Sequence, residues 1–209
     1  MSDKISERIS SAERREQILG AAAVVFGERG YFGATTDQVA RAAGISQPYV
    51  VRMFGSKENL FVEVLGRSLD KLLTAFAETL DQWKADGRPT SDDPAYNELA
   101  RRLGLAYVNL IEDRGILLSL MQAFSMGHDA AIGGRARDGF ITIYRMLREE
   151  GGFAADDARS FLAEGMLLNT LLGLRLPDEY GHDACATELL ESTFRTKLDL
   201  VLQATGGPA

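Results

Sequence analysis

The stretch at residues 35–60, TTDQVARAAGISQPYVVRMFGSKENL, carries the signals of two short helices and of the start of a third. Thr35 or Thr36 can begin the first helix, because a hydroxyl at the N-cap accepts a hydrogen bond from a backbone N–H that has no partner within the helix. Gln38 stands where the partner of Thr35 in a capping box would be. Helices commonly end at a residue such as Gly44, so we expect this helix to stop just before it.

The segment after this glycine has the pattern of a second helix. Ser46 can serve as its N-cap, and Pro48 lies in its first turn, where a missing N–H costs no hydrogen bond. Phe54 closes this short helix and is expected to anchor it in the core, while Ser56 can cap the helix that follows. A helix, a glycine turn and a capped helix in this order predict a helix-turn-helix motif over about residues 35–54, whose second helix enters the major groove of DNA.

Polar side chains on the second helix are suited to contact DNA. Gln47 can pair bidentately with adenine, and Arg52 can pair with guanine or with a phosphate. Tyr49 can contact a phosphate or a thymine methyl group. Lys57 stands in the first turn of the following helix, where a cation beside free backbone N–H groups would bind a phosphate. The residues predicted to contact DNA are Thr35, Thr36, Ser46, Gln47, Pro48, Tyr49, Arg52 and Lys57.

From about residue 14 to residue 65 the chain resembles the DNA-binding domain of TetR-type transcriptional regulators. The matching residues occur in register along the whole stretch: Phe26, Gly30-Tyr31, Thr35-Thr36, Val39-Ala40, Ala43-Gly44-Ile45-Ser46, Phe54 and Ser56-Lys57-Glu58-Asn59-Leu60. Members of this family usually carry Tyr where this chain has Val51, and a small residue where it has Tyr49. Either Tyr49 or Arg52 is therefore expected to replace the phosphate contact of the usual Tyr.

The formal net charge of −7 is unevenly distributed along the chain. Residues 1–60 contain eight Lys or Arg and seven Asp or Glu, whereas residues 61–209 contain 15 and 23. The predicted DNA-binding part, residues 1–60, is therefore close to neutral, and the net negative charge lies in the rest of the protein. We expect DNA affinity to come from a few placed cations and to be sensitive to salt.

Composition argues against several other classes of protein. The chain is 45% apolar and 25% charged, which is typical of a globular protein. Residues 1–17 are polar, so we expect neither a secretory signal nor a membrane anchor and place the protein in the cytoplasm. Cys185 has no second cysteine to pair with, and His128 and His182 do not have the spacing of metal ligands. We expect no metal, no cofactor and no contact with a membrane.

Apolar residues recur at helical spacing along the rest of the chain, without the alternation typical of strands. A helix from about residue 12 is expected to end at Gly30, and the helix after Ser56 is expected to continue for more than two dozen residues. In the turn-rich segment that follows, Asp93 can cap the next helix, with Pro94 in its first position. Further helices are predicted over about residues 115–126, 129–150, 156–174 and 184–204.

These elements predict an all-α fold with two parts. Residues 1–60 are expected to form an N-terminal three-helix helix-turn-helix domain. Residues 61–209 are expected to form a larger C-terminal helical domain, and the resemblance assigns ligand binding and dimerisation to it.

The last two predicted helices carry wide apolar stripes. In relatives of this chain the final pair of helices packs against its symmetry mate as a four-helix bundle, and the resemblance implies the same arrangement here. A two-fold dimer would also place matched heads on a palindromic site. The alternative, in which both stripes are buried within one chain, stays open. The residues predicted at the interface are Phe161, Leu162, Leu190, Phe194, Leu198 and Val201.

The resemblance also implies that a small hydrophobic effector binds between the middle helices. Pockets of this kind are lined by apolar and aromatic side chains, with a few polar groups that orient the ligand. Each candidate side chain could equally belong to the core. The candidates for the walls are Trp83, Tyr107, Met121, Phe124, Phe140 and Tyr144, and those for orientation are Gln122 and Asn169.

Together these features predict a homodimeric repressor that binds double-stranded DNA at a palindromic operator and is released by a small-molecule ligand. A ligand that prefers another angle of the long helix would move the two heads to a spacing that no longer fits successive major grooves. The alternatives are an activator of the same fold and a ligand-binding helical protein that has lost DNA reading. An enzyme is not expected, because the sequence has no nucleophile elbow, no phosphate-binding glycine loop and no His with a suitable partner.

Overall fold

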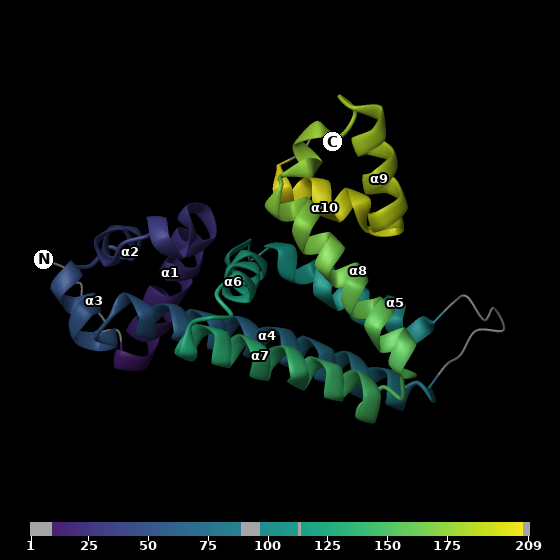
Figure 1. Cartoon of the computed structure of the whole chain (residues 1–209), viewed down its shortest axis with the longest axis horizontal. Helices are drawn as coiled ribbons and strands as arrows, with labels where there is room; N and C mark the ends of the chain where they lie inside the picture. Colours follow the sequence, from purple (N-terminus) through teal and green to yellow (C-terminus); the bar gives the residue numbers. More distant parts are fainter. Residues whose placement is uncertain (1–9, 89–96, 113, 207–209) are drawn as a thin grey trace, which may run out of the picture.

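The computed structural model describes residues 10–88, 97–112 and 114–206, and every regular element within these ranges is helical (Figure 1). No strand occurs among these residues, so the predicted all-α class is confirmed. The N-terminal helices form a head at one end of a long helix, α4 (Lys57–Ala85), and the other helices lie along this helix and to one side of it.

Three helices form the head: α1 (Ser11–Gly33), α2 (Thr36–Ala42) and α3 (Gln47–Phe54). The first of them begins at a capping box, in which the Ser10 hydroxyl accepts a hydrogen bond from Glu13 N and the Glu13 carboxylate accepts one from Ser10 N. At Gly30 the backbone leaves helical geometry with a φ of 71°, which glycine adopts without a steric penalty. The regular part of α1 therefore ends where the sequence predicts.

The long helix α4 joins the head to the rest of the molecule, here called the body. Ser56 caps it, as predicted, because the Ser56 hydroxyl accepts a hydrogen bond of 3.0 Å from Asn59 N. The helix has 29 residues and is therefore about 43 Å long at a rise of 1.5 Å per residue. The domain boundary predicted at residue 60 falls inside α4 and stays a prediction.

Aromatic side chains of α4 contact both parts of the molecule. The Phe61 ring makes an edge contact with Phe26 of α1, with 4.9 Å between the ring centroids. Phe76 lies about 22 Å from Phe61 along the helix, at a rise of 1.5 Å per residue. Its ring contacts Phe161 of the body, with 5.9 Å between the ring centroids. One helix therefore packs against both the head and the body, whose buried side chains form one continuous hydrophobic core.

The described part of the body contains α5 (Glu98–Asn109), α6 (Arg114–Ser125), α7 (Ala130–Arg145), α8 (Ala155–Gly173), α9 (Ala184–Phe194) and α10 (Leu198–Thr205). Between them lie the 3₁₀ turns η1 (Leu110–Glu112), η3 (Leu176–Glu179) and η4 (Arg195–Lys197) and the π turn η2 (Met146–Glu150). α7 runs beside α4, whereas α5 and α8 rise from the far end of α4 toward α9 and α10 (Figure 1).

Glycines allow two pairs of helices to approach closely. A Cβ atom added to Gly115 of α6 would lie only 2.7 Å from the carbonyl carbon of Ala23 in α1. A Cβ atom added to Gly139 of α7 would lie 2.5 Å from the side chain of Leu69 in α4. Because real Cβ atoms do not come so near to other heavy atoms, α6 is pressed against the head and α7 against α4.

The last predicted helix, at residues 184–204, is interrupted in the structure. α9 ends at Phe194, Arg195 adopts a φ of 48°, and α10 begins at Leu198. Phe194 and Leu198 are buried on the two sides of the interruption. No Gly or Pro marks this position, so the prediction of one continuous helix was wrong for lack of a local signal.

Two further boundaries differ from the expected pattern. The helix predicted over residues 129–150 begins after Asp129 as expected but changes to the π turn η2 over its last five residues. Asp93 and Pro94, predicted to start the helix after the loop, lie outside the described residues. α5 is capped instead by the Asn97 side chain, which accepts a hydrogen bond of 2.9 Å from Ala100 N.

Within the described ranges, no helix combines the length and apolar character needed to cross a membrane.

Candidate nucleic-acid interface and effector cavity

The turn from α2 to α3 is held by local hydrogen bonds. Thr35 and Gln38 form the predicted capping box, with the Thr35 hydroxyl 3.2 Å from Gln38 N and Gln38 Oε1 3.0 Å from Thr35 N. Gly44 then adopts a φ of 67°, and Ile45 N donates to Ala40 O over 2.9 Å. The chain therefore leaves α2 and enters α3 in the order that the sequence predicts.

The short helix α3 has one buried face and one exposed face. Val50 and Phe54 are 1% and 5% exposed and belong to the core of the head, as predicted for Phe54. The exposed side chains of this helix are Gln47, Pro48, Val51 and Arg52. They recur at the spacing of a single helical face, which is the face that a helix-turn-helix directs toward base edges.

The first turns of α2 and α3 are joined by a hydrogen bond of 3.2 Å from Gln47 Nε2 to the Thr36 hydroxyl. Ser46 occupies the N-cap of α3, as predicted, but its hydroxyl makes no capping hydrogen bond. The expected side-chain cap is therefore wrong, and the Ser46 side chain is exposed instead. The structure brings together the candidate DNA contacts at this end of the motif, which are Thr35, Thr36, Ser46, Gln47 and Pro48.

Tyr49 and Arg52 form a pair three residues apart on α3. The guanidinium carbon of Arg52 lies 4.8 Å from the centroid of the Tyr49 ring, a cation–π contact that orients the long side chain. Tyr49 is half-buried, whereas Arg52 is exposed. Among the described residues Arg52 forms no ion pair, so its charge is not neutralised by a carboxylate of the head.

Lys57 is directed inward and not toward the exposed face of the motif. Its Nζ donates to the carbonyl oxygens of Tyr31 and Ala34 over 3.0 and 3.2 Å and lies 4.6 Å from the centroid of the Tyr31 ring. The ammonium thereby ties the start of α4 to the end of α1. This position does not support the phosphate contact predicted for Lys57, because the ammonium already donates hydrogen bonds to two backbone carbonyls of the head.

Val51 belongs to the exposed face of α3 although the predicted set of contacts left it out. Its side chain is 41% exposed in the middle of the helix. An apolar side chain there is suited to contact a thymine methyl group. The sequence carried the signal, because Val51 follows Gln47 by four residues and the two therefore share a face.

A cavity of about 850 Å³ lies in the body, between α4, α5, α6, α7, α8, α9 and the turn η4. This volume is in the range of small-molecule binding sites. Apolar side chains make up much of its wall, among them Leu72, Phe76, Val108, Phe153, Phe161 and Phe194.

One polar pair is buried in the wall of the cavity. The Tyr107 hydroxyl donates to Asn169 Oδ1 over 2.8 Å, and Asn169 is only 3% exposed. Burial raises the pKa of Tyr107 to about 12, although the hydrogen bond with Asn169 acts in the opposite direction. The phenol is therefore protonated near neutral pH and acts as a hydrogen-bond donor.

The predicted ligand-binding residues divide into two groups. Those that line the cavity are Tyr107, Phe124, Phe140 and Asn169, and those outside its lining are Trp83, Met121, Gln122 and Tyr144. Gln122 turns toward the head, where its Nε2 donates to Phe26 O over 2.7 Å. Met121 lies against α8, because a Cβ atom added to Gly173 would be 3.4 Å from its sulfur. Periodicity placed these residues on the correct helices but could not tell which neighbour each one faces.

Four residues of the predicted dimer interface are buried within the chain: Leu190, Phe194, Leu198 and Val201, each at most 8% exposed. Their assignment to an interface is therefore corrected. The reason is the bend at Arg195, since α10 turns back and packs on η1 and α5 of the same chain. Phe161 and Leu162 are half-buried and line the cavity, so they too face the interior of the body.

Other kinds of site are not apparent in the part of the chain that the structure describes. No group of three or more His, Cys, Asp or Glu side chains in these ranges is arranged to hold a metal ion. Cys185 is an exposed free thiol at the start of α9.

Both the head and the overall fold of this chain are similar to those of known proteins. The sequence model of the family described as "Bacterial regulatory proteins, tetR family" matches residues 18–64, which span most of α1, the whole motif and the start of α4. The chain is 41% identical over 73 residues to the HTH-type transcriptional activator FasR of Mycolicibacterium smegmatis, a match that covers 35% of this chain and 33% of FasR. With FasR the similarity therefore extends over only a third of that protein's length.

Two other comparisons cover nearly the whole chain. The HTH-type transcriptional dual regulator CecR of Shigella flexneri is 27% identical over 216 residues, with 93% of this chain and 94% of CecR covered. The crystal structure of a TetR-like transcriptional regulator from Rhodococcus sp. RHA1 superposes with a TM-score of 0.57 at 20% identity, covering 95% of this chain and 97% of that chain. The fold, the helix-turn-helix and these similarities agree: the chain belongs to the TetR family of helix-turn-helix transcriptional regulators.

Proposed function

We propose that this regulator is a homodimeric repressor that binds palindromic double-stranded DNA through α3 and leaves it when a small, largely apolar ligand occupies the cavity of the body. The observation that carries the proposal is the division of α3 into a face buried in the head and a face of polar and small apolar side chains in solvent. A helix anchored in this way can enter a major groove without exposing the core that holds it.

Each exposed side chain of α3 has a role that its chemistry supports. Gln47 pairs with adenine, and Arg52, oriented by the Tyr49 ring, pairs with guanine or a phosphate. Val51 contacts a thymine methyl group. Thr35 and Thr36, at the start of α2, contact the phosphate backbone beside the groove.

The cavity is connected to the head by two helices. Leu72 and Phe76 of α4 line the cavity, and the same helix begins in the core of the head. Phe124 of α6 lines the cavity as well, while Gly115 at the other end of α6 is pressed against α1. A ligand that favours a wider cavity would move both helices and with them the head, which shifts the population toward a form that does not fit the operator.

The dimer is proposed to form through the exposed face of α8 and α9. This face replaces the buried residues Leu190, Phe194, Leu198 and Val201 as the interface. Leu167 on α8, Leu174 at the C-cap of α8 and Leu189 on α9 are large apolar side chains that are 40%, 69% and 40% exposed. Two chains that pair through this face about a two-fold axis would bury these side chains. The resulting dimer would have two heads.

The direction of regulation has one specific alternative. FasR is named as an activator and CecR as a dual regulator, and the sign of regulation depends on where an operator lies relative to a promoter. Activation by the same DNA-binding geometry is therefore the second candidate.

A binding titration tests the proposal. The purified protein is titrated onto the intergenic DNA upstream of its own coding sequence, with a scrambled duplex as competitor. We expect Gln47→Ala and Arg52→Ala each to weaken specific binding by about tenfold, since one base contact is worth about 1–3 kcal/mol. Arg145→Ala, which removes an exposed cation of the body, serves as the control and should bind like the wild type. Unchanged binding by both α3 variants would refute the assigned reading helix, and a wild type that binds no genomic fragment would favour a helical ligand-binding protein.

A further inference from the structure

A single lysine stands out in the wall of the cavity. Lys197 ends the turn η4 between α9 and α10, and its side chain is half-buried among the residues that line the cavity. Its ammonium lies against Gly104 of α5, where an added Cβ atom would be 2.8 Å from Lys197 Nζ. The missing side chain at Gly104 therefore provides the space that the charged group occupies.

This ammonium has no counter-ion of its own. Lys197 forms no hydrogen bond or ion pair with the residues that the structure describes. Burial, together with repulsion from Arg101, lowers the pKa of Lys197, while attraction to Glu164 raises it. A half-buried cation without a partner is costly, and an anion placed beside it would offset that cost.

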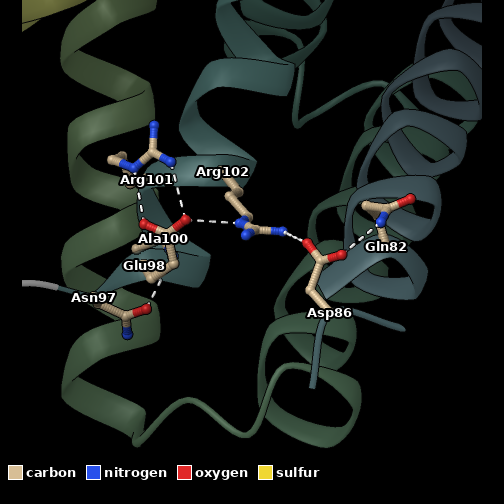
Figure 2. A network of polar contacts seen from close by, with 7 residues as sticks. All are labelled: Gln82, Asp86, Asn97, Glu98, Ala100, Arg101 and Arg102. Carbon is tan, nitrogen blue, oxygen red and sulfur yellow. Dashed lines mark hydrogen bonds and ion pairs between the residues drawn. The ribbon is translucent and has the colours of Figure 1, made fainter. Parts of the chain in front are cut away.

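Of the other charged groups around the cavity, Glu164 acts favourably on Lys197 and Arg101 acts against it. Arg101 is already held by Glu98, with both Nε and Nη2 of Arg101 2.9 Å from carboxylate oxygens (Figure 2). The charged residues of the lining are Arg101, Asp157, Glu164, Arg195 and Lys197, three cations and two carboxylates. The cavity therefore combines an apolar wall with one more cation than carboxylate among its charged residues.

We propose that the ligand of this cavity is an amphipathic anion, whose acid group pairs with Lys197 beside Gly104 and whose apolar body lies along Phe76, Phe161 and Phe194. This inference rests on the proposed role of the cavity as the effector site and specifies the chemical class of the effector. A cationic ligand of the same shape would be repelled by Lys197, and a neutral one would leave the ammonium unpaired.

Three probes with the same tail and different head groups test this assignment. Decanoate, decanol and decylamine are titrated into the full-length protein by calorimetry at pH 8, below the concentrations at which they form micelles. For the wild type we expect decanoate to bind about tenfold more tightly than decanol, the size of one charge-assisted hydrogen bond, and decylamine to bind more weakly than both.

Two variants locate the effect at Lys197. Lys197→Met keeps the aliphatic stem and should bind decanoate and decanol equally, with the affinity for decanol unchanged. Unchanged decanol binding also shows that the variant is folded. Arg145→Met removes a cation from the exposed surface of α7 and should keep the tenfold preference of the wild type. A preference for decanol or decylamine in the wild type, or a preference for decanoate that survives in Lys197→Met, would overturn the proposal.

The failure of this inference can be told apart from failure of the proposed function. DNA binding by the same wild-type preparation is measured with each probe present. Specific DNA binding combined with weak decanoate binding would overturn the anion assignment and leave the DNA-binding role in place. Absence of binding by all three probes would overturn it too, together with the role of the cavity. Release of DNA by decanoate but not by decanol supports the inference and the proposed coupling.

Discussion

At the scale of single residues, the head shows how a charged side chain can be assigned to the wrong partner from sequence. The position of Lys57 in the first turn of α4 was predicted correctly, because a serine cap and the following residues are local signals. Its partners were not, since the carbonyl groups of Tyr31 and Ala34 come from 26 and 23 residues earlier in the chain. Contacts of this kind depend on tertiary structure, which no short pattern contains.

The role of Lys57 leads to a prediction about stability. Lys57→Met should lower the free energy of unfolding by about 1–3 kcal/mol, because two carbonyl oxygens at the end of α1 lose a charged donor. Urea denaturation followed by circular dichroism measures this change. Arg52→Met is the matched control, since it removes an exposed cation from the same head and should alter stability by less than about 0.5 kcal/mol. Equal stability of Lys57→Met and the wild type would return Lys57 to the set of phosphate contacts.

At the scale of helices, the glycine at the contact between α1 and α6 decides how closely the head meets the body. Gly115→Ala should destabilise the protein by about 1–3 kcal/mol, because the added Cβ atom would lie 2.7 Å from the backbone of Ala23 and force the helices apart. Gly134→Ala provides the control within α7, where an added Cβ atom meets nothing within 4 Å. The control should raise stability by about 0.5–1 kcal/mol through its higher helix propensity. Thermal unfolding of the two variants should therefore shift in opposite directions, and a parallel shift would contradict the close contact.

Helix positions were predictable where capping and glycine signals are local, as at Thr35, Gly44, Ser56 and Asp129. The interruption at Arg195 was not, because the residues around it have neither Gly nor Pro. This single bend also explains the error at the dimer interface, since it turns the apolar stripe of α10 inward. An apolar stripe in a sequence shows that a face is covered but does not identify what covers it.

At the scale of the whole molecule, the corrected interface gives a prediction about assembly. The double variant Leu167→Glu and Leu189→Glu should be a folded monomer, because both side chains are exposed in the single chain and a carboxylate would be costly to bury against a partner. Size-exclusion chromatography with light scattering measures the mass. Ile141→Glu, which introduces the same change at an exposed site on α7, should remain dimeric. A dimer that persists in the double variant would place the interface elsewhere on the molecule.

The central claim is that the exposed face of α3 reads base pairs, and the most direct measurement is a base-pair scan. Kd values of the wild type and of Arg52→Ala are determined on an operator and on the set of its single base-pair substitutions. The account predicts that Arg52→Ala loses about 1–3 kcal/mol of discrimination at one symmetric pair of positions and keeps the discrimination of the wild type at the others. A uniform loss of affinity at every position, or an unchanged profile, would contradict it.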